Sequence, residues 1–544
     1  MVVLPYGGFY NRTEDQLINY TFRNSLSYNQ TFNTDHQVTG LFGQELKSAD
    51  RQNSNNTGIG YQYDNGGTPF VDYRFVKQMI ENNFQYYGNE NEYDRFVGFF
   101  ANASYTYKGK YNFNATVRED GSNRLGKSQS ARWLPTWTVS GRWNVDRERF
   151  MEGSSFSYLT LRGSYGLNAS YGSATNSTVV LRTQLTNRPN RTDRQVAIDI
   201  ENLENADLTW EKKYEANVGV DLGLFNNRLT VTVDAYNRNS FDLISFIKTG
   251  GIGGEVYKAA NYADMESHGI EVTLGGKPIS SRDFNWSSQL TFGYNTNTIT
   301  DAKNNPLIFD LVRSEGGSKE GYPVRGLFSL PFKGLDPSSG IALFGDEKGN
   351  TSHAVNLQSD STQYLKYEGS VDPTITGGFS NTFNYKNFSA NFLITYQTGN
   401  KIRLTPAYRS AYTDLDASPG EFKNRWTLPG DEALTTVPSI ADLYANFDLA
   451  GAGAYPYNNY NYSSARVVDG SFVRLKTTSV SYRLSERTLK SIGLNAVSIS
   501  LIGNNLWLIY SDPKLNGQDP EFFNAGGVAL PINKQFVMSL KVGF

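Results

Sequence analysis

The sequence contains no cysteine, only three histidines and only five methionines. The lack of cysteine excludes disulfides, thiol catalysis and cysteine metal sites, and it suits an envelope protein that crosses an oxidising compartment without mispairing. His36, His268 and His353 are far apart and lack metal-ligand spacing, so we interpret them as polar strand or loop residues. No GxSxG or HExxH motif occurs, which leaves an enzyme without a nucleophile or base. We predict no enzyme activity, no metal and no cofactor.

Long apolar runs and strong charge are absent as well. No window approaches 18 consecutive apolar residues, so no transmembrane helix is expected. A net charge of −2 excludes a strongly basic nucleic-acid binder, and we predict no nucleic-acid partner. The first residues show no basic region followed by an apolar one, so no signal peptide is visible. An outer-membrane or secreted protein would therefore need its true N-terminus upstream, and we expect this chain to be a C-terminal portion.

The residues that are abundant favour an all-β protein. Aromatic residues make up 14% of the chain, with 35 Tyr and 33 Phe, alongside 51 Gly. The stretch from Leu208 to Asp242 shows the pattern clearly, because apolar and polar residues alternate on both sides of Asn226-Asn227, a pair that tolerates the positive φ of a tight turn. Each alternating run is long enough to cross a bilayer at the tilt of a barrel strand. This stretch predicts a hairpin of two long strands.

The same pattern recurs to the C-terminus and gives about 15 strands. The parity changes within Phe472–Leu484, which predicts a β-bulge. Short connections are expected at 108–110, 225–227, 278–283 and 386–387, and long ones at 47–91, 168–208, 298–373, 400–470 and 509–532. Outer-membrane barrels have short periplasmic turns and long extracellular loops. We therefore predict a transmembrane antiparallel β-barrel whose apolar face meets outer-membrane lipid.

Several clusters have both a functional and a structural interpretation. Arg118, Glu119, Asp120 and Arg124 could form a catalytic carboxylate cluster, but we favour charge pairing at the lumenal end of a strand. The segments 336–340 and 346–350 resemble a calcium loop but lack the ligand alternation of an EF-hand, so solvated turns are favoured. Aromatic loop residues are the candidate substrate contacts, since rings stack on sugar faces: Tyr408, Trp426, Tyr455, Tyr457, Tyr460 and Tyr462.

Five motifs in order resemble SusC/RagA-type TonB-dependent outer-membrane transporters. They are Arg118–Gly126, Leu208–Lys212, Gly223–Leu229, Ser471–Lys476 and Asp519–Glu521, with the terminal Phe544 fitting the same family. The resemblance implies about 15 strands of a 22-stranded barrel, with the plug domain that fills the family's barrels absent from this chain. It also implies a SusD-like surface lipoprotein partner and a TonB complex that acts through the missing N-terminal part. Phe544 would then face lipid and serve as the barrel-assembly signal.

The sequence thus supports a fragment of a TonB-energised importer of a glycan or oligopeptide in the outer membrane of a Gram-negative bacterium. A passive porin-like channel and a secreted β-rich glycan-binding protein remain as alternatives. Neither the substrate nor the choice between glycan and peptide follows from the sequence.

Overall fold

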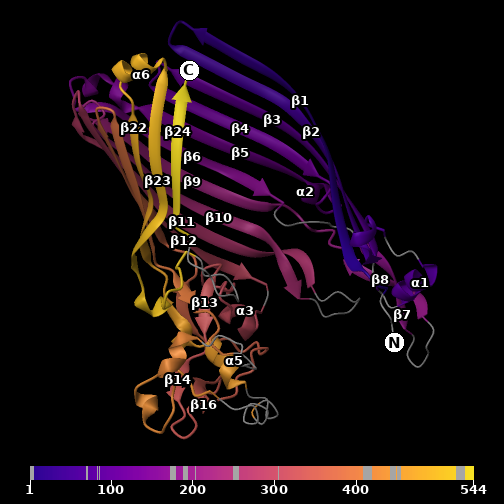
Figure 1. Ribbon diagram of the computed structural model, residues 1–544. Coiled ribbons are helices and arrows are strands. Elements are labelled where there is room, and N and C mark those ends of the chain that lie inside the picture. Colours follow the sequence, from indigo (N-terminus) through magenta and orange to yellow (C-terminus); the bar gives the residue numbers. More distant parts are fainter. Residues whose placement is uncertain are drawn as a thin grey trace. The chain divides into compact units, whose positions relative to one another are not determined.

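A fifteen-stranded antiparallel sheet dominates the computed structural model (Figure 1), which describes residues 5–68, 72–81, 84, 86–171, 179–187, 194–202, 204–248, 257–303, 305–408, 419–440, 449, 455–521 and 533–544. The strands follow one another in chain order from one edge to the other: β1 (Gly8–Phe32), β2 (His36–Tyr61), β3 (Tyr87–Tyr107), β4 (Tyr111–Ser122), β5 (Trp133–Asn144), β6 (Phe156–Ser170), β9 (Glu211–Leu224), β10 (Leu229–Lys248), β11 (Tyr257–Ser280), β12 (Phe284–Ala302), β18 (Ile375–Tyr385), β19 (Phe388–Thr398), β22 (Phe472–Arg483), β23 (Ala496–Ser511) and β24 (Gln535–Gly543). The predicted all-β class and strand number are confirmed.

The predicted turns are confirmed as well. Lys108, Phe225, Asn226, Asn227 and Lys386 all have positive φ, between 50° and 62°, as tight hairpin turns require. Two further connections on the turn side carry short helices, with η2 (Val145–Arg147) and η3 (Arg149–Met151) before β6 and α6 (Glu486–Ile492) before β23. No described helix is long and apolar enough to cross a membrane.

The predicted loop 47–91 is shorter than expected, because β2 continues to Tyr61 and β3 begins at Tyr87. Only 62–86 connect them, with η1 (Tyr63–Asn65) and α1 (Tyr73–Glu81) in the described part. The alternation of apolar residues stops near Leu46 although the strand does not. A strand that leaves the bilayer meets water on both faces, so its sequence loses the period-two signal that marked it.

Contacts divide the chain into two compact units. The first comprises Met1–Gly141, Ser164–Glu215 and Ser240–Ala263, and the second comprises Arg142–Gly163, Ala216–Asn239 and Asp264–Phe544. The first unit holds β1 to β4, α2 (Gln129–Arg132) and the excursion hairpin β7 (Val180–Asn187) and β8 (Arg194–Asn202), with parts of the neighbouring strands. The second holds β12 and all elements after it.

The two faces of β1 to β4 differ in chemistry. One face is hydroxyl- and amide-rich, and its side chains bond across strands: Asn102 Nδ2 donates to Thr116 Oγ1 (2.7 Å) and Asn112 Nδ2 donates to Thr106 Oγ1 (2.7 Å). The other face carries the apolar residues, which remain exposed: Leu26, Phe42, Phe99, Phe113 and Val117. An apolar exposed face suits lipid and a self-bonded polar face suits a lumen.

The height of the apolar band in the first unit can be worked out from β3. Tyr107 pairs with Tyr111 beside the turn, and Val97 lies ten residues further along the same face. Ten residues rise about 34 Å along a strand, or about 26 Å at a tilt of about 40°. Because a barrel's apolar band is about 25 Å tall, Val97 marks the outer boundary of the membrane.

The predicted bulge lies at Lys476. Ladder pairs run from Leu475 to Thr477 without Lys476 against both β19 and β23. The extra residue resets the parity, which explains why Val473 and Val480 are out of phase in the sequence although the strand is continuous.

Candidate functional site

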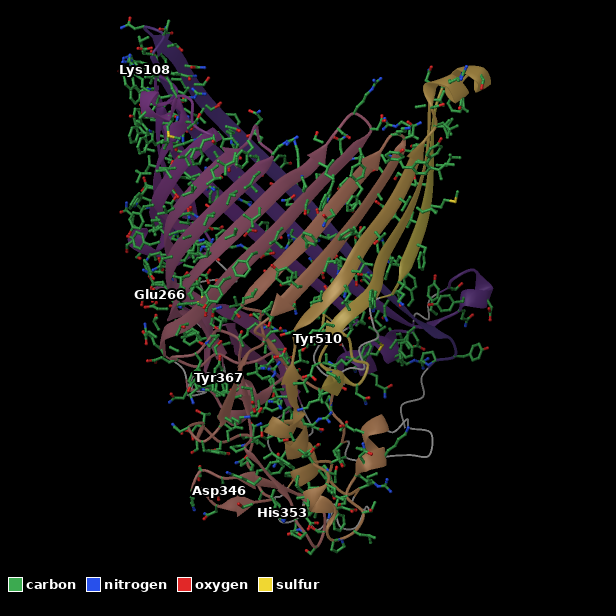
Figure 2. All side chains as sticks on the ribbon, turned by 90° about the vertical axis from the view of Figure 1, so that its left-hand side faces the viewer. Lys108, Glu266, Asp346, His353, Tyr367 and Tyr510 are labelled. Carbon is green, nitrogen blue, oxygen red and sulfur yellow. The ribbon has the colours of Figure 1, made fainter. Side chains whose placement is uncertain are left out.

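Two of the long connections of the second unit fold together into a lobe, defined here as the described residues within 305–374 and 399–471. It contains α3 (Ile308–Val312), β13 (Gly326–Ser329), β14 (Phe332–Leu335), β15 (Ala342–Gly345), β16 (Thr351–Ser352), β17 (Lys366–Ser370), β20 (Lys401–Arg403), η4 (Gly420–Asn424), η5 (Asp431–Ala433), α5 (Pro456–Asn461), η6 (Ser464–Arg466) and β21 (Val467–Asp469). Figure 2 shows Asp346 and His353 at the end of the lobe far from β23, and Tyr367 nearer to Tyr510 of that strand. In outer-membrane barrels the long connections are the extracellular ones.

The lobe has its own apolar core, and four of the six predicted substrate aromatics belong to it. Tyr408, Trp426, Tyr457 and Tyr460 are only 5%, 8%, 7% and 1% exposed. The ring centroid of Tyr408 lies 5.2 Å from that of Tyr457 and 5.5 Å from that of Tyr460. Their polar atoms are partly satisfied inside, as Trp426 Nε1 donates to Glu432 Oε2 (3.2 Å). In this conformation the four rings stabilise the lobe, so their contact with substrate stays a prediction.

The other two predicted aromatics differ. Tyr455 is 54% exposed and precedes α5. Tyr462 follows α5, and its ring lies edge-on to that of Phe309, with centroids 5.8 Å apart. Tyr462 lines a cavity, and substrate contact by both residues remains a prediction.

That cavity, which we call the neck cavity, has a volume of about 210 Å³ and lies where the lobe joins the strands. Aromatic rings, charged groups and amides line it: Phe309, Arg313, Ser314, Glu315, Arg403, Leu404, Thr405, Pro406, Asn461, Tyr462 and Gln518. Arg313 Nη2 lies 3.3 Å from Glu315 Oε1 at its rim. Such a lining can stack on a ring or apolar group and can both donate and accept hydrogen bonds.

Arg403 connects several segments of the lobe beside the neck cavity. It is 4% exposed, and its guanidinium donates to the carbonyl oxygens of Phe328 (2.6 Å) and Ser463 (3.0 Å) and to Ser329 Oγ (2.9 Å). Burial lowers the pKa of Arg403 to about 9, so the group stays protonated at neutral pH. A buried charge with fixed carbonyl partners ties three separate loop segments to one point.

A second cavity of about 370 Å³ lies at the start of the lobe. Lys319, Glu320, Asp360 and Thr362 are among its lining residues, and Lys319 Nζ donates to Thr362 O (3.1 Å). Burial lowers the pKa of Lys319. The lining of this cavity is mostly polar and supplies both signs of charge.

Two of the sequence motifs, Ser471–Lys476 and Asp519–Glu521, form ion pairs with each other. Arg474 Nη2 lies 2.6 Å from Asp519 Oδ1, and both side chains are 3% exposed. Glu521 lies 2.6 Å from Arg474 Nε and 3.0 Å from the bulge residue Lys476. The segment after η7 (Pro513–Leu515) is thereby fixed to β22 beside the neck. Both motifs were visible in the sequence, but their pairing was not predicted. The opposite charges of the two motifs were the signal that could have indicated it.

The structure agrees with charge pairing for the cluster at the end of β4. Arg118 bonds to Asp120 (Nε to Oδ2, 2.8 Å) and Arg124 bonds to Asp94 (Nη2 to Oδ2, 2.6 Å), while Glu119 is exposed. Within the described residues, no group of three His, Cys, Asp or Glu side chains could hold a metal ion.

The two segments that resemble a calcium loop form turns whose carboxylates bind their own backbone. Asp336 Oδ1 accepts bonds from the N–H groups of Ser338 and Ser339, both 2.9 Å. Asp346 Oδ1 accepts bonds from the N–H groups of Lys348 (2.9 Å) and Asn350 (2.8 Å). These are the turns that the sequence favoured.

Gly121–Ser128 also has the glycine and lysine spacing of a phosphate-binding loop, which the sequence reasoning missed. In the structure the Gly126 N–H donates to Leu208 O (2.8 Å), and Lys127 pairs with Glu204 (2.5 Å). The following helix, α2, has only four residues. The chain's own groups occupy this loop, so the match is coincidental.

Trp210 lies in a buried cluster with Leu125, Leu208 and Ile244, and its Nε1 donates to Arg132 O (3.1 Å). The alternation of the stretch from Leu208 to Asp242 predicts a position near the outer interface for Trp210. Instead it precedes β9 and anchors the excursion between β6 and β9 to the wall of the first unit.

The comparisons with known proteins agree on one family. The family model of the TonB dependent receptor-like β-barrel matches residues 4–428. A TonB-dependent receptor of Formosa agariphila is 27% identical over 94% of this chain and 51% of its own length, and the TonB-dependent receptor SusC of Bacteroides thetaiotaomicron is 29% identical over 38% of this chain and 21% of its own.

Among solved structures, the RagAB peptide transporter superposes with a TM-score of 0.80 at 21% identity, over 98% of this chain and 56% of that one. The chain spans about half the length of the curated relatives that match most of it. The long strands, the alternating connection lengths, the two-faced sheet and the family match lead to one conclusion: the chain belongs to the TonB-dependent receptor β-barrel family of the Gram-negative outer membrane.

Proposed function

We propose that the protein imports a glycan or an oligopeptide across the outer membrane, using energy passed on by TonB, and that a SusD-like surface lipoprotein works with it. The chain described here would supply part of the barrel wall and the extracellular lobe. It acts by binding and passage rather than by catalysis.

The observation that carries this proposal is the folded lobe with its neck cavity. A channel that only sieves solutes needs no rigid extracellular structure, whereas a lobe with its own core holds cavity side chains in fixed positions. The neck cavity offers aromatic, amide and charged groups together. Such groups suit a polar oligomer with many hydrogen-bonding sites.

The lining leaves both cargo classes open. Tyr462 and Phe309 can stack on a sugar face or hold an apolar side chain, and Arg313 and Glu315 can bind the charges of a peptide. The similar solved structure is described as a peptide transporter, and the curated relatives include SusC. The experiment must therefore test both classes.

The test uses cells that lack the gene and are complemented with the full-length protein. Uptake of a labelled oligosaccharide mixture and a labelled oligopeptide mixture is measured with and without a protonophore. We expect uptake of one class that stops when the membrane is de-energised. Uptake of both classes that persists without energy would support the porin-like channel instead and refute the proposal.

Variants then test the neck cavity. Tyr462→Ala should reduce uptake of the cargo about tenfold, since a stacking ring in a binding site contributes about 1–1.5 kcal/mol. Tyr385→Ala, an exposed tyrosine beside the 386–387 turn, serves as the control and should leave uptake unchanged. If Tyr455→Ala reduces uptake and Tyr462→Ala does not, the binding surface lies on the outside of the lobe rather than in the neck.

A further inference from the structure

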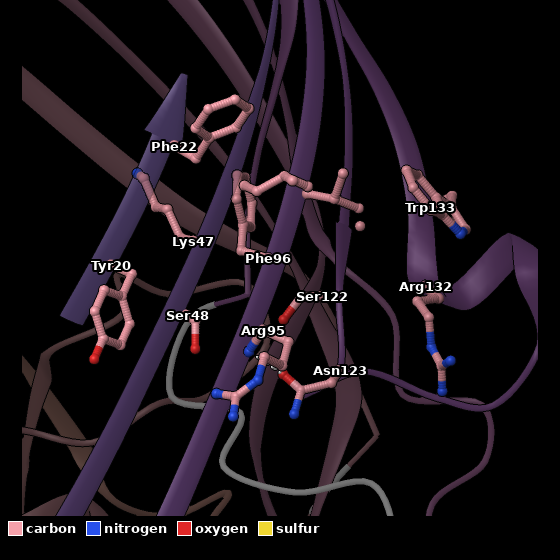
Figure 3. Close-up of a pocket in the computed structure, with 13 residues that line it drawn as sticks. Tyr20, Phe22, Lys47, Ser48, Arg95, Phe96, Ser122, Asn123, Arg132 and Trp133 are labelled. Carbon is pink, nitrogen blue, oxygen red and sulfur yellow. Dashed lines mark hydrogen bonds between the residues drawn. The ribbon is translucent and has the colours of Figure 1, made fainter. Parts of the chain in front are cut away.

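A hollow with a volume of about 450 Å³ lies on the first unit (Figure 3). Its apolar end is a row of directly paired residues on neighbouring strands, Phe22, Leu46 and Val97, and the row ends at Gly121. Phe22 is 55% exposed and Leu46 is 46% exposed, as expected of side chains that face lipid. The hollow therefore opens on the outward face of the sheet.

Gly121 allows Trp133 to pack against the strand. A Cβ at this position would lie 3.0 Å from ring atoms of Trp133, so the indole occupies the space that a side chain at 121 would take. Trp133 thereby lines the hollow together with Leu46 and Val97. Its amphipathic ring is of the kind that is enriched at membrane interfaces.

The other end of the hollow is polar and cationic. Ser48 and Arg95 pair with each other in the next row toward the outside, and Figure 3 shows Arg95, Asn123 and Arg132 on the same side of the pocket. Arg95 Nη1 already pairs with Asp50 Oδ1 (2.5 Å). Arg132 makes no ion pair with any residue that the structure describes, and its Nε is buried without a hydrogen-bond partner.

The position of the hollow matches its polarity. Val97 marks the outer boundary of the apolar band, so the apolar end of the pocket lies at lipid-chain depth and Arg95 and Arg132 lie at headgroup level. A guanidinium beside the headgroup layer of an outer leaflet faces phosphate groups, for which its fork of N–H donors is suited. Glu119, one row nearer the turn, does not line the pocket.

We propose that this hollow is a binding site for a phosphate-bearing lipid of the outer leaflet. Its phosphate binds Arg132, with Arg95 and Asn123 beside it, and the start of one acyl chain lies against Leu46, Val97 and Trp133.

Lipid binding by the full-length protein in a neutral detergent tests this site. Short-chain phosphatidylglycerol, diacylglycerol of equal chain length and free glycerol phosphate are titrated, and bound lipid is counted by native mass spectrometry. We expect phosphatidylglycerol to bind at least about tenfold more tightly than diacylglycerol, because its phosphate accepts charge-assisted hydrogen bonds that a lipid without phosphate cannot make. Glycerol phosphate should not bind measurably, since it lacks the chain.

Arg132→Gln should abolish the preference for phosphatidylglycerol. Arg51→Gln is the matched control. Arg51 is also a positively charged residue of this sheet, but its side chain lies on the opposite face of β2 from Ser48. Leu46→Trp fills the apolar end without removing charge and should weaken both lipids, so it tests the site even if Arg132→Gln fails to fold. Equal binding of the two lipids, a preference that survives Arg132→Gln, or tight binding of glycerol phosphate alone would each overturn the proposal.

Discussion

The buried pair of Arg474 and Asp519 allows a quantitative test of how the last described loop is held. Asp519→Asn keeps the size and shape of the side chain, and its oxygen can still accept the bond from the Glu521 N–H (2.9 Å). The substitution removes only the negative charge that faces Arg474 at 2.6 Å. Both groups are 3% exposed, so water cannot replace the lost partner.

Removing one partner of a buried ion pair costs about 3–5 kcal/mol. Here Glu521 remains 2.6 Å from Arg474 Nε and offsets part of the cost, so we expect about 2–3 kcal/mol. The loss appears as easier opening of the segment from Asp512 to Glu521, because this contact fixes it to β22. That free energy corresponds to a rise of about 30- to 150-fold in the local opening equilibrium.

Hydrogen exchange of the full-length protein in detergent measures this opening at the amides of Leu515, Asn516 and Gln518, whose N–H groups are hydrogen-bonded within the segment. The double variant with Arg474→Met removes both charges and should exchange more slowly than Asp519→Asn alone, since no orphaned charge remains. A rise below about threefold in Asp519→Asn, or a double variant that opens more than the single one, would refute the reasoning.

Three more outcomes follow from the structure. Gly219→Ala should destabilise the second unit by about 1–3 kcal/mol, because a Cβ at this position would lie 2.7 Å from Arg162 Cζ. Unfolding measured by heat-dependent gel mobility checks this. Gly163→Ala is the control and should be neutral, since its Cβ would meet nothing nearer than 3.8 Å. Hydrogen bonds from Ser338 lower the pKa of Asp336 from 3.8 to about 2, so its stabilisation of the turn is complete above pH 3.8 and is lost as the pH falls through about 2. The protection factors of the turn amides, which are exchange rates corrected for the intrinsic rate at each pH, should therefore fall between pH 5 and 2 in the wild type and stay constant in Asp336→Asn. Deletion of Phe544 should lower the amount of protein assembled in the outer membrane without changing the melting of the assembled fraction, and an unchanged amount would contradict its role as assembly signal.

The strands and turns inside the membrane could be predicted because lipid on one face and lumen on the other impose a strict period of two. The bulge at Lys476 was visible for the same reason, as a break in that period. The upper part of β2 was missed because water on both faces removes the constraint. From Lys47 to Asn56 the sequence is polar at every position except Ala49.

The lobe could not be predicted from its sequence. Its tyrosines stand in an Asn-rich stretch that is equally typical of an exposed loop, and only the long-range packing of Tyr460 against the segment around Tyr408 shows that they form a core. Arg403 was missed because its partners are mostly backbone carbonyls. Every residue has a backbone carbonyl, so the sequence does not reveal which ones bind an arginine. Charge complementarity between Arg474 and Asp519 was available but needed the fold to bring the motifs together.

The extension of β2 beyond the membrane boundary has a thermodynamic consequence. The strand from Lys47 to Tyr61 rises about 50 Å and is hydrogen-bonded to β1 along its length and to β3 over most of it. A disordered loop of the same length would lose about 1–2 kcal/mol of conformational entropy per residue when a partner ordered it. Here that entropy has already been lost on folding, so a molecule that binds this wall keeps nearly all the free energy of its contacts.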